Sequence, residues 1–255
     1  NSDDAGKVMG LASYSNSHIS PFPSLQLTQD GYRICFPQEI FDEVSKKYST
    51  KPNYYLMDLV KDLWIVYCKN LYGNLRSLSG SPTEDVRKDI AMRLQKTLET
   101  ALLHSAAQLR SQTGEKNLCL AGGVALNCSA NGQLERAGIF DNVYIYPSSN
   151  DAGVAIGSAL YEYHTSGNNN SFDSSAITAN PFLGPEYSDT EILDAINRYH
   201  FHSDRCDEDF ADIALLISEG AVVGWLQGKA EIGPRALGGR SILADPRRTD
   251  IHKKV

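Results

Sequence analysis

The sequence predicts an α/β fold, and the segment that predicts it most directly is residues 117–163. Short apolar stretches alternate there with stretches whose apolar residues recur at helical spacing. This alternation is typical of helices packed on a mainly parallel sheet. Apolar residues make up 42% of the 255-residue chain, which is ample for a packed core and suits one large or two smaller domains.

The amino-terminal part has the weakest pattern. Residues 1–50 are rich in turn-forming residues, with Pro21, Pro23 and Pro37 between short apolar stretches. The glycine motif of this region is GKVMGLA at 6–12. Residues 54–72 carry many apolar and aromatic side chains and predict a helix.

A long helix is predicted after a loop at 79–82. Ser81 is placed to cap it, Pro82 suits its first turn, and Glu84 would complete a capping box. Apolar residues recur at helical spacing as far as Leu109, and Gly114 is expected to end the helix.

The central segment begins with a buried strand at 117–121, followed by a turn at Gly122 and Gly123. The sequence then predicts, in order, a helix at 124–136, a strand at 143–146, a loop at 147–151 and a helix at 152–163. Ligands of parallel α/β sheets bind at the carboxyl ends of the strands. Both loops of this segment follow predicted strands, so they are candidate ligand sites.

The carboxyl-terminal part begins with an Asn- and Ser-rich stretch at 164–180, which predicts a linker or surface loop. Helices are predicted from residue 188 to 196 and from 207 to 218, and a strand follows Gly220 at 221–226. Residues 228–248 then combine several glycines with regularly placed arginines.

Charge and cysteine content exclude some classes of protein. The net charge is −7, whereas proteins that bind nucleic acids are usually basic, so we expect no nucleic-acid partner. The five cysteines form no CxxC motif and no paired framework, which favours a reducing, cytoplasmic location. The sequence contains no apolar run long enough to cross a membrane, so we expect no membrane partner. The chain begins without methionine and ends abruptly, so we expect an internal fragment of a longer protein.

The first candidate motif is LAGGVALN at 120–127. Gly122 and Gly123 would let the backbone approach a ligand, and the start of the following helix would direct free N–H groups and the positive end of its dipole toward it. Phosphate is the natural ligand of such a turn, and Asn127 could bond a ribose or a base. The local pattern fits a simple tight strand-to-helix turn equally well.

The second motif is PSSNDAG at 147–153. Asp151 is predicted to follow a strand and precede a helix. Its carboxylate could cap that helix, which the local pattern favours. It could also face a metal or a phosphate at the same sheet edge as the glycine pair.

The third motif covers 228–247 and contains Arg235, Arg240 and Arg247 together with Glu231 and Asp245. Guanidinium groups bind phosphate and carboxylate through paired hydrogen bonds. Surface salt bridges are the alternative, but ordinary surface loops rarely combine so many glycines with spaced arginines. The pattern therefore favours an oxyanion site.

These motifs resemble signatures of the O-carbamoyltransferase family, which serves nodulation-factor, antibiotic and other natural-product pathways. The matching stretches are LAGGVALNCSANGQL at 120–134, PSSNDAGVAIGSAL at 147–160, EIGPRALGGRSILADPR at 231–247 and GKVMGLASY at 6–14. The resemblance implies half of an actin-like ATPase or sugar-kinase type domain at 1–165, a linker at 166–190, and the start of a second α/β domain that handles carbamoyl phosphate at 191–255.

The resemblance also implies an activity. ATP and carbamoyl phosphate would yield carbamoyladenylate, and the carbamoyl group would pass to a hydroxyl of a small-molecule or glycan acceptor. A divalent metal would assist, with iron expected and manganese or magnesium as alternatives. Matching positions imply that Arg235 and Arg240 are catalytic and that Asp151 is a metal ligand. The implied nucleotide-binding residues are Lys7, Gly10, Gly122, Gly123 and Asn127, and the implied substrate-binding residues are Glu231, Gly233 and Arg247.

The chain departs from the family pattern because the family's two-histidine metal motif does not occur in it. On its own, the chain is therefore expected to be inactive. One alternative is a non-catalytic fragment that binds a nucleotide. Another is threonylcarbamoyl transfer to tRNA, which the GPRALG segment and the acidic charge disfavour. Homo-oligomer formation stays open.

Overall fold

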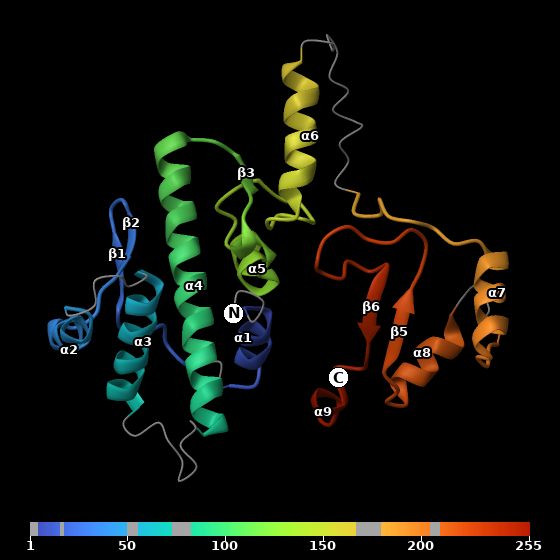
Figure 1. Cartoon of the computed structure of the whole chain (residues 1–255), viewed down its shortest axis with the longest axis horizontal. Coiled ribbons are helices and arrows are strands. Elements are labelled where there is room, and N and C mark those ends of the chain that lie inside the picture. The colour runs from blue at the N-terminus through green and yellow to red at the C-terminus, as the bar shows by residue number, and fades with distance from the viewer. Residues whose placement is uncertain (1–4, 16–17, 50–55, 73–82, 167–179, 205–209) are drawn as a thin grey trace. The chain divides into compact units, whose positions relative to one another are not determined.

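The structure is a computed structural model that describes residues 5–15, 18–49, 56–72, 83–166, 180–204 and 210–255 (Figure 1). The chain divides into two compact units. Unit 1 comprises Asn1–Leu120 and Asn127–Tyr144, and unit 2 comprises Ala121–Leu126 and Ile145–Val255.

Unit 1 is organised around one long helix, α4, with α1, α5 and the β1–β2 hairpin packed along it (Figure 1). Its elements are α1 (Ala5–Ala12), β1 (Leu25–Thr28), β2 (Gly31–Ile34), α2 (Gln38–Tyr48), α3 (Leu56–Tyr72), α4 (Glu84–Thr113), β3 (Asn117–Leu120), α5 (Cys128–Arg136) and β4 (Asn142–Ile145).

The largest core of unit 1 joins α2 and α3. Its buried members include Phe22, Ile40, Val44, Leu63 and Tyr67. The ring centroids of Phe22 and Tyr67 lie 6.0 Å apart in an edge-to-face arrangement, a geometry that aromatic pairs favour. The predicted helix at 54–72 is therefore confirmed over the described residues 56–72, and its aromatic side chains belong to a core.

The turn-rich prediction for residues 1–50 was wrong in two places, because α1 and α2 form there. The GKVMGLA motif lies in α1, where Ala12 is buried with Ala91 and Met92 of α4. In α2, Ile40, Val44 and Tyr48 fall on one face and are buried. Packing against a neighbouring helix stabilises both short helices, and such contacts are not visible in local turn propensity.

The predicted start of α4 was also wrong. Thr83 is the N-cap, and its side chain accepts a hydrogen bond from the Val86 backbone N–H at 3.4 Å. Ser81 and Pro82 of the proposed capping box lie outside the described residues, and Glu84 is the first residue of the helix rather than the third. The predicted end is confirmed, since Gly114 adopts a left-handed conformation with φ 71°.

The central segment has the predicted order of elements with one shifted boundary. Strand β3 pairs with β4, and α5 lies between them in sequence. The predicted helix at 124–136 begins only at Cys128, because residues Gly123–Leu126 form a short 3₁₀ helix, η2. Asn127 then caps α5 through its side chain.

Unit 2 contains η2, α6 (Gly153–Thr165), α7 (Asp189–Tyr199), α8 (Ala211–Ser218), β5 (Val223–Leu226), β6 (Arg240–Leu243) and α9 (Ile251–Lys254). The predicted opening of α7 is confirmed, with a full capping box between Ser188 and Glu191. Strands β5 and β6 form an antiparallel hairpin in which Val223 pairs with Leu243. The long connection between these strands carries most of the third motif.

The α/β class is confirmed, but the sheets differ from the expected one. In the part of the chain that the structure describes, the strands form separate two-stranded sheets, and β1–β2 and β5–β6 are antiparallel. The two strands of the alternating segment pair with each other as β3 and β4, and the antiparallel pairs lie outside that segment. The actin-like fold and the domain division at 166–190 stay predictions, and residues 167–179 of the linker lie outside the described residues.

Neither a membrane span nor a disulfide occurs among the described residues. No helix there is long and apolar enough to cross a membrane. Cys35, Cys68, Cys119 and Cys128 are free.

Candidate active site

The three sequence motifs contact one another inside unit 2. The backbone N–H of Gly122 donates a 2.7 Å hydrogen bond to the carbonyl oxygen of Ser149, which joins the first motif to the second. The guanidinium Nε of Arg235 donates to the carbonyl oxygen of Leu126 at 3.3 Å, which joins the third motif to the first. Three segments distant in sequence therefore form one cluster of loops.

Gly233 brings the third motif against the second. Its φ of 93° lies in the left-handed region, and a Cβ at this position would overlap the carbonyl oxygen of Pro147. Only glycine meets both requirements without strain. A substitution here would push the third motif away from the loop at 147–151.

Open space surrounds the glycine pair of the first motif. A Cβ on Gly122 or Gly123 would meet no atom within 4 Å. Gly122 adopts a φ of 95°, in the left-handed region that favours glycine, whereas Gly123 has no positive φ. Neither packing nor backbone conformation requires glycine at position 123, so the backbone there is accessible to a ligand.

The loop at 147–151 combines buried hydroxyls with an exposed carboxylate. Ser148 and Ser149 are 2% and 8% exposed, and Ser149 Oγ has no hydrogen-bond partner among the described residues. Asp151 is exposed, and the N-cap of α6 is Ala152, which makes no side-chain capping bond. The interpretation of Asp151 as a helix cap was therefore wrong, and its carboxylate is available for a ligand.

A buried carboxylate shapes the third motif. Glu231 is 6% exposed and accepts hydrogen bonds from the backbone N–H groups of Leu237, at 3.0 and 3.1 Å, and of Gly239, at 2.7 Å. Its oxygens therefore hold the loop between β5 and β6 in place. The local sequence pattern did not predict this role. A glutamate close in sequence to several arginines equally predicts an ion pair.

Two arginines of this loop have guanidinium groups that pair with no carboxylate in the part of the chain that is described. Arg235 is half-buried and bonded only through Nε to Leu126. Arg240 is exposed and donates from a terminal nitrogen to the Gly233 carbonyl oxygen at 2.9 Å. Both keep N–H donors for an anion, and their carbonyl contacts orient them without neutralising their charge.

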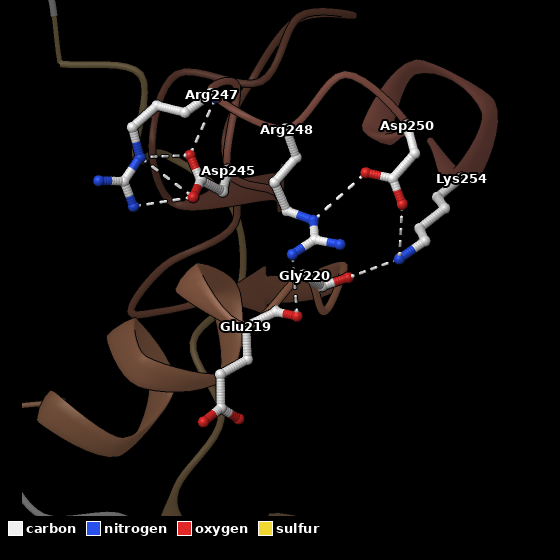
Figure 2. Close-up of polar contacts among 7 residues, drawn as sticks. All are labelled: Glu219, Gly220, Asp245, Arg247, Arg248, Asp250 and Lys254. Atoms are coloured by element: carbon white, nitrogen blue, oxygen red, sulfur yellow. Dashed lines mark hydrogen bonds and ion pairs between the residues drawn. The ribbon is translucent and has the colours of Figure 1, made fainter.

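Arg247 differs because it already has a carboxylate partner (Figure 2). Its Nε and one terminal nitrogen reach the two oxygens of Asp245 at 2.8 Å, and its backbone N–H also donates to Asp245. These hydrogen bonds lower the pKa of Asp245 to about 2. The hydrogen bond from Arg247 to Asp245 likewise raises the pKa of Arg247. One edge of the Arg247 guanidinium remains for other ligands.

Figure 2 also shows the hydrogen bonds that link α9 and the residues just before it to the end of α8. Arg248 donates to the Glu219 carbonyl oxygen at 3.4 Å, and Lys254 donates to that of Gly220 at 3.2 Å. Asp250 pairs with both cations, at 3.3 and 3.4 Å. Cations at a helix carboxyl end are favourable because the last carbonyl groups carry partial negative charge. This network supports the end of the third motif.

The other predicted nucleotide-binding residues lie in unit 1. Lys7 is exposed on α1, and Gly10 is exposed in the last turn of that helix. The side chain of Asn127 accepts from the Ala130 N–H at 3.0 Å and exchanges hydrogen bonds with Gln95 at 2.9 and 3.1 Å. The amide of Asn127 is therefore engaged within the protein, as cap and as partner of Gln95.

The described residues do not form a complete metal site. They contain no group of three or more His, Cys, Asp or Glu side chains that could hold an ion. Asp151 alone offers one oxygen-donor group, which does not fit a stable iron or manganese site.

The sequence analysis missed Ser149, which follows Ser148 in the second motif and whose buried hydroxyl has no hydrogen-bond partner in the described part of the chain. It also missed Gln95 and Glu99, which are buried on α4 and bond Asn127 and Ser129. The paired serines at 148–149 were a visible signal. The α4 residues had none, because helical spacing does not show which partner a polar side chain meets.

Comparison with known proteins agrees with the order of the motifs. The family model described as carbamoyltransferase N-terminus matches residues 1–160. The model described as carbamoyltransferase C-terminus matches residues 214–255. The first match covers the motifs at 120–127 and 147–153, and the second covers the arginine-rich motif.

Curated relatives match the same region. Nodulation protein NolNO of Sinorhizobium fredii is 41% identical over 169 residues, which are 66% of this chain and 25% of that protein. Nodulation protein NolO of Bradyrhizobium diazoefficiens is 39% identical over 179 residues, 69% of this chain and 32% of that protein. An uncharacterised protein of Synechocystis sp. is 41% identical over 189 residues, 71% of this chain and 30% of that protein. The chain thus spans about a quarter to a third of the length of these relatives.

Proposed function

Because the chain belongs to the carbamoyltransferase family, we propose that it forms part of an enzyme that transfers a carbamoyl group from carbamoyl phosphate to a hydroxyl of a small-molecule or glycan acceptor. The transfer proceeds through carbamoyladenylate, made with ATP. The observation that supports this proposal best is the contact of all three motifs within unit 2.

Carbamoyl phosphate binds at the third motif in this proposal. Arg235 and Arg240 keep guanidinium donors without carboxylate partners among the described residues, and both are held by carbonyl groups of neighbouring loops. Two such cations neutralise the charge of the phosphate as it leaves. Glu231 and Gly233 support binding by fixing the loop, and Arg247 presents its remaining edge to the substrate.

The nucleotide binds at the glycine pair. The open space at Gly122 and Gly123 admits a phosphate or an adenylate close to the backbone. Lys7 and Gly10 lie near its sugar in this proposal, and Asn127 lines the same ligand. The Asn127 amide would then act partly by capping α5.

A divalent metal, iron or otherwise manganese or magnesium, is part of the proposal for the whole enzyme, and Asp151 is the residue of this chain that would contact it. The role proposed for the arginines does not depend on it, because binding of carbamoyl phosphate needs only their charge and hydrogen-bond donors.

The first prediction tests the arginines. Calorimetric titration of the 255-residue chain with carbamoyl phosphate should show binding, and Arg235→Gln and Arg240→Gln should each weaken it at least about tenfold, because each removes a charge-assisted pair of hydrogen bonds. Arg198→Gln, an exposed arginine of α7 in the same unit, is the matched control and should leave the affinity unchanged. Equal affinity of the doubly substituted protein and the wild type would refute the proposed site.

A further inference from the structure

Unit 1 contains a cavity of which the proposed reaction uses one lining residue, Asn127. Its volume is about 370 Å³, and α1, β2, α3 and α4 contribute to its walls. Ligand pockets usually measure about 300–1,000 Å³, so the cavity is large enough for a small molecule. Its apolar lining includes Val8, Ile34, Trp64, Leu94, Leu98 and Ala101.

No charged side chain is among the described residues that line this cavity. An ion or phosphate would therefore lose its hydration there without gaining a partner, which is costly. The chemistry of the walls selects an uncharged ligand, unlike the arginine-rich motif of unit 2.

Apart from Tyr32, which is 51% exposed, the polar side chains of the lining already have partners. Gln95 and Asn127 bond each other in both directions, and Gln95 also donates to Glu99 at 2.9 Å. Thr97 Oγ1 donates to the Arg93 carbonyl oxygen at 2.7 Å and accepts from the Phe22 N–H at 2.9 Å. A polar ligand would give up hydrogen bonds to water for groups that are already satisfied, which disfavours it. The cavity therefore favours an apolar ligand.

One wall of the cavity is held rigidly. The Trp64 ring packs edge-on against Phe36 and Tyr67, with centroid distances of 5.1 and 5.9 Å. These contacts keep the indole in place before any ligand arrives, which lowers the entropy lost on binding.

We propose that this cavity is a binding site for a neutral, apolar small molecule, separate from the carbamoyl phosphate site. The volume, the uncharged lining, the satisfied amides and the fixed indole together support this assignment. The site would operate whether or not the proposed transfer reaction is correct.

The test uses the neutral fluorescent probe N-phenyl-1-naphthylamine. Trp64 lies in the cavity wall, so energy transfer from its indole reports a bound probe once Trp225→Phe has removed the other tryptophan. Saturable binding is expected. Leu94→Asp, at a cavity position 41% exposed, should weaken it at least about tenfold because the charge enters an apolar site. Leu109→Asp, 43% exposed on the same helix and outside the cavity, should stay within about twofold of the parent affinity.

A second cavity variant keeps the test valid if Leu94→Asp fails to fold. Ala101→Phe fills the cavity with an apolar side chain and should also weaken probe binding, while circular dichroism reports whether each variant keeps its helices. Probe affinity unchanged in both cavity variants would overturn the proposal. Competition by adenosine would also overturn it, because the cavity would then be the base site of the proposed nucleotide ligand. Carbamoyl phosphate affinity is measured in parallel and should not change in either variant.

Discussion

At the scale of single residues, the candidate site depends on side chains and glycines that place loops rather than on a catalytic dyad. Glu231 binds two backbone N–H groups, and Gly233 lets one loop approach another. Arg235 and Arg240 are oriented by carbonyl oxygens and keep their charge. This arrangement suits the binding of an anion whose leaving group carries charge.

Gly233 gives the sharpest prediction at this scale. Gly233→Ala should destabilise unit 2 by about 3 kcal/mol or more, because it combines a left-handed backbone with overlap on Pro147. Gly238→Ala is the matched control, since Gly238 has φ 111° and no atom within 4 Å of the added Cβ; it should cost only about 1–2 kcal/mol. Urea unfolding followed by Trp225 fluorescence measures both.

The same pair of variants tests the convergence of the motifs. Gly233→Ala should also weaken carbamoyl phosphate binding more than Gly238→Ala does, because it separates the third motif from the loop at 147–151. Equal stability and equal affinity of the two variants would show that the close approach at Pro147 has no consequence for the site.

At the scale of elements, the N-terminal caps of the helices α4 and α7 differ between the two units. Ser188 and Glu191 form a reciprocal capping box on α7, with bonds of 3.3 and 2.8 Å. Thr83 caps α4 through one 3.4 Å bond. The shorter helix α7 has no buried residue in unit 2 and depends more on its cap.

We predict that Ser188→Ala costs about 1 kcal/mol and Thr83→Ala about 0.5 kcal/mol, because the first removes a two-way cap and the second one long bond. Thr113→Ala, at the other end of α4, removes an exposed bond to the Leu109 carbonyl oxygen and the acceptor of the Glu115 N–H, and should change stability by less than about 0.5 kcal/mol. Unfolding curves recorded with Trp64 for α4 and Trp225 for α7 compare the three. A Thr83→Ala cost equal to or above that of Ser188→Ala would contradict the ranking.

At the scale of the whole molecule, the described residues provide a candidate anion site but no complete set of metal ligands. The described residues hold no cluster of three metal-ligating side chains, and the chain spans 25–32% of the nodulation proteins it resembles. The proposed reaction needs both activation by ATP and transfer to an acceptor. The chain of 255 residues therefore supplies part of this machinery.

We predict that the chain binds carbamoyl phosphate without turning over ATP. Exchange of labelled pyrophosphate into ATP, with and without saturating carbamoyl phosphate, should stay at the background level, while calorimetry still detects carbamoyl phosphate. Exchange above background would show that Asp151 and the arginines suffice for adenylate formation. Loss of both exchange and binding would instead contradict the proposed function.

The sequence by itself determined the order of helices and strands from α4 to β5, the end of α4 at Gly114, the opening of α7 at Ser188 and the position of every motif, but it did not predict η2, β6 or α9. These features depend on local chemistry, such as helical spacing, capping residues and glycine conformation, which neighbours in sequence reveal. The family also followed from the sequence, because four ordered motifs are far more specific than one.

Only the tertiary structure decided which segments meet. It paired strands into separate small sheets, made a helix of GKVMGLA through contact with α4, and turned Glu231 into a support of its loop. It also brought Gly122, Ser149 and Arg235 into one cluster and left a cavity beside Trp64. Contacts between residues distant in sequence depend on how whole elements pack, and the same local pattern is compatible with several such packings.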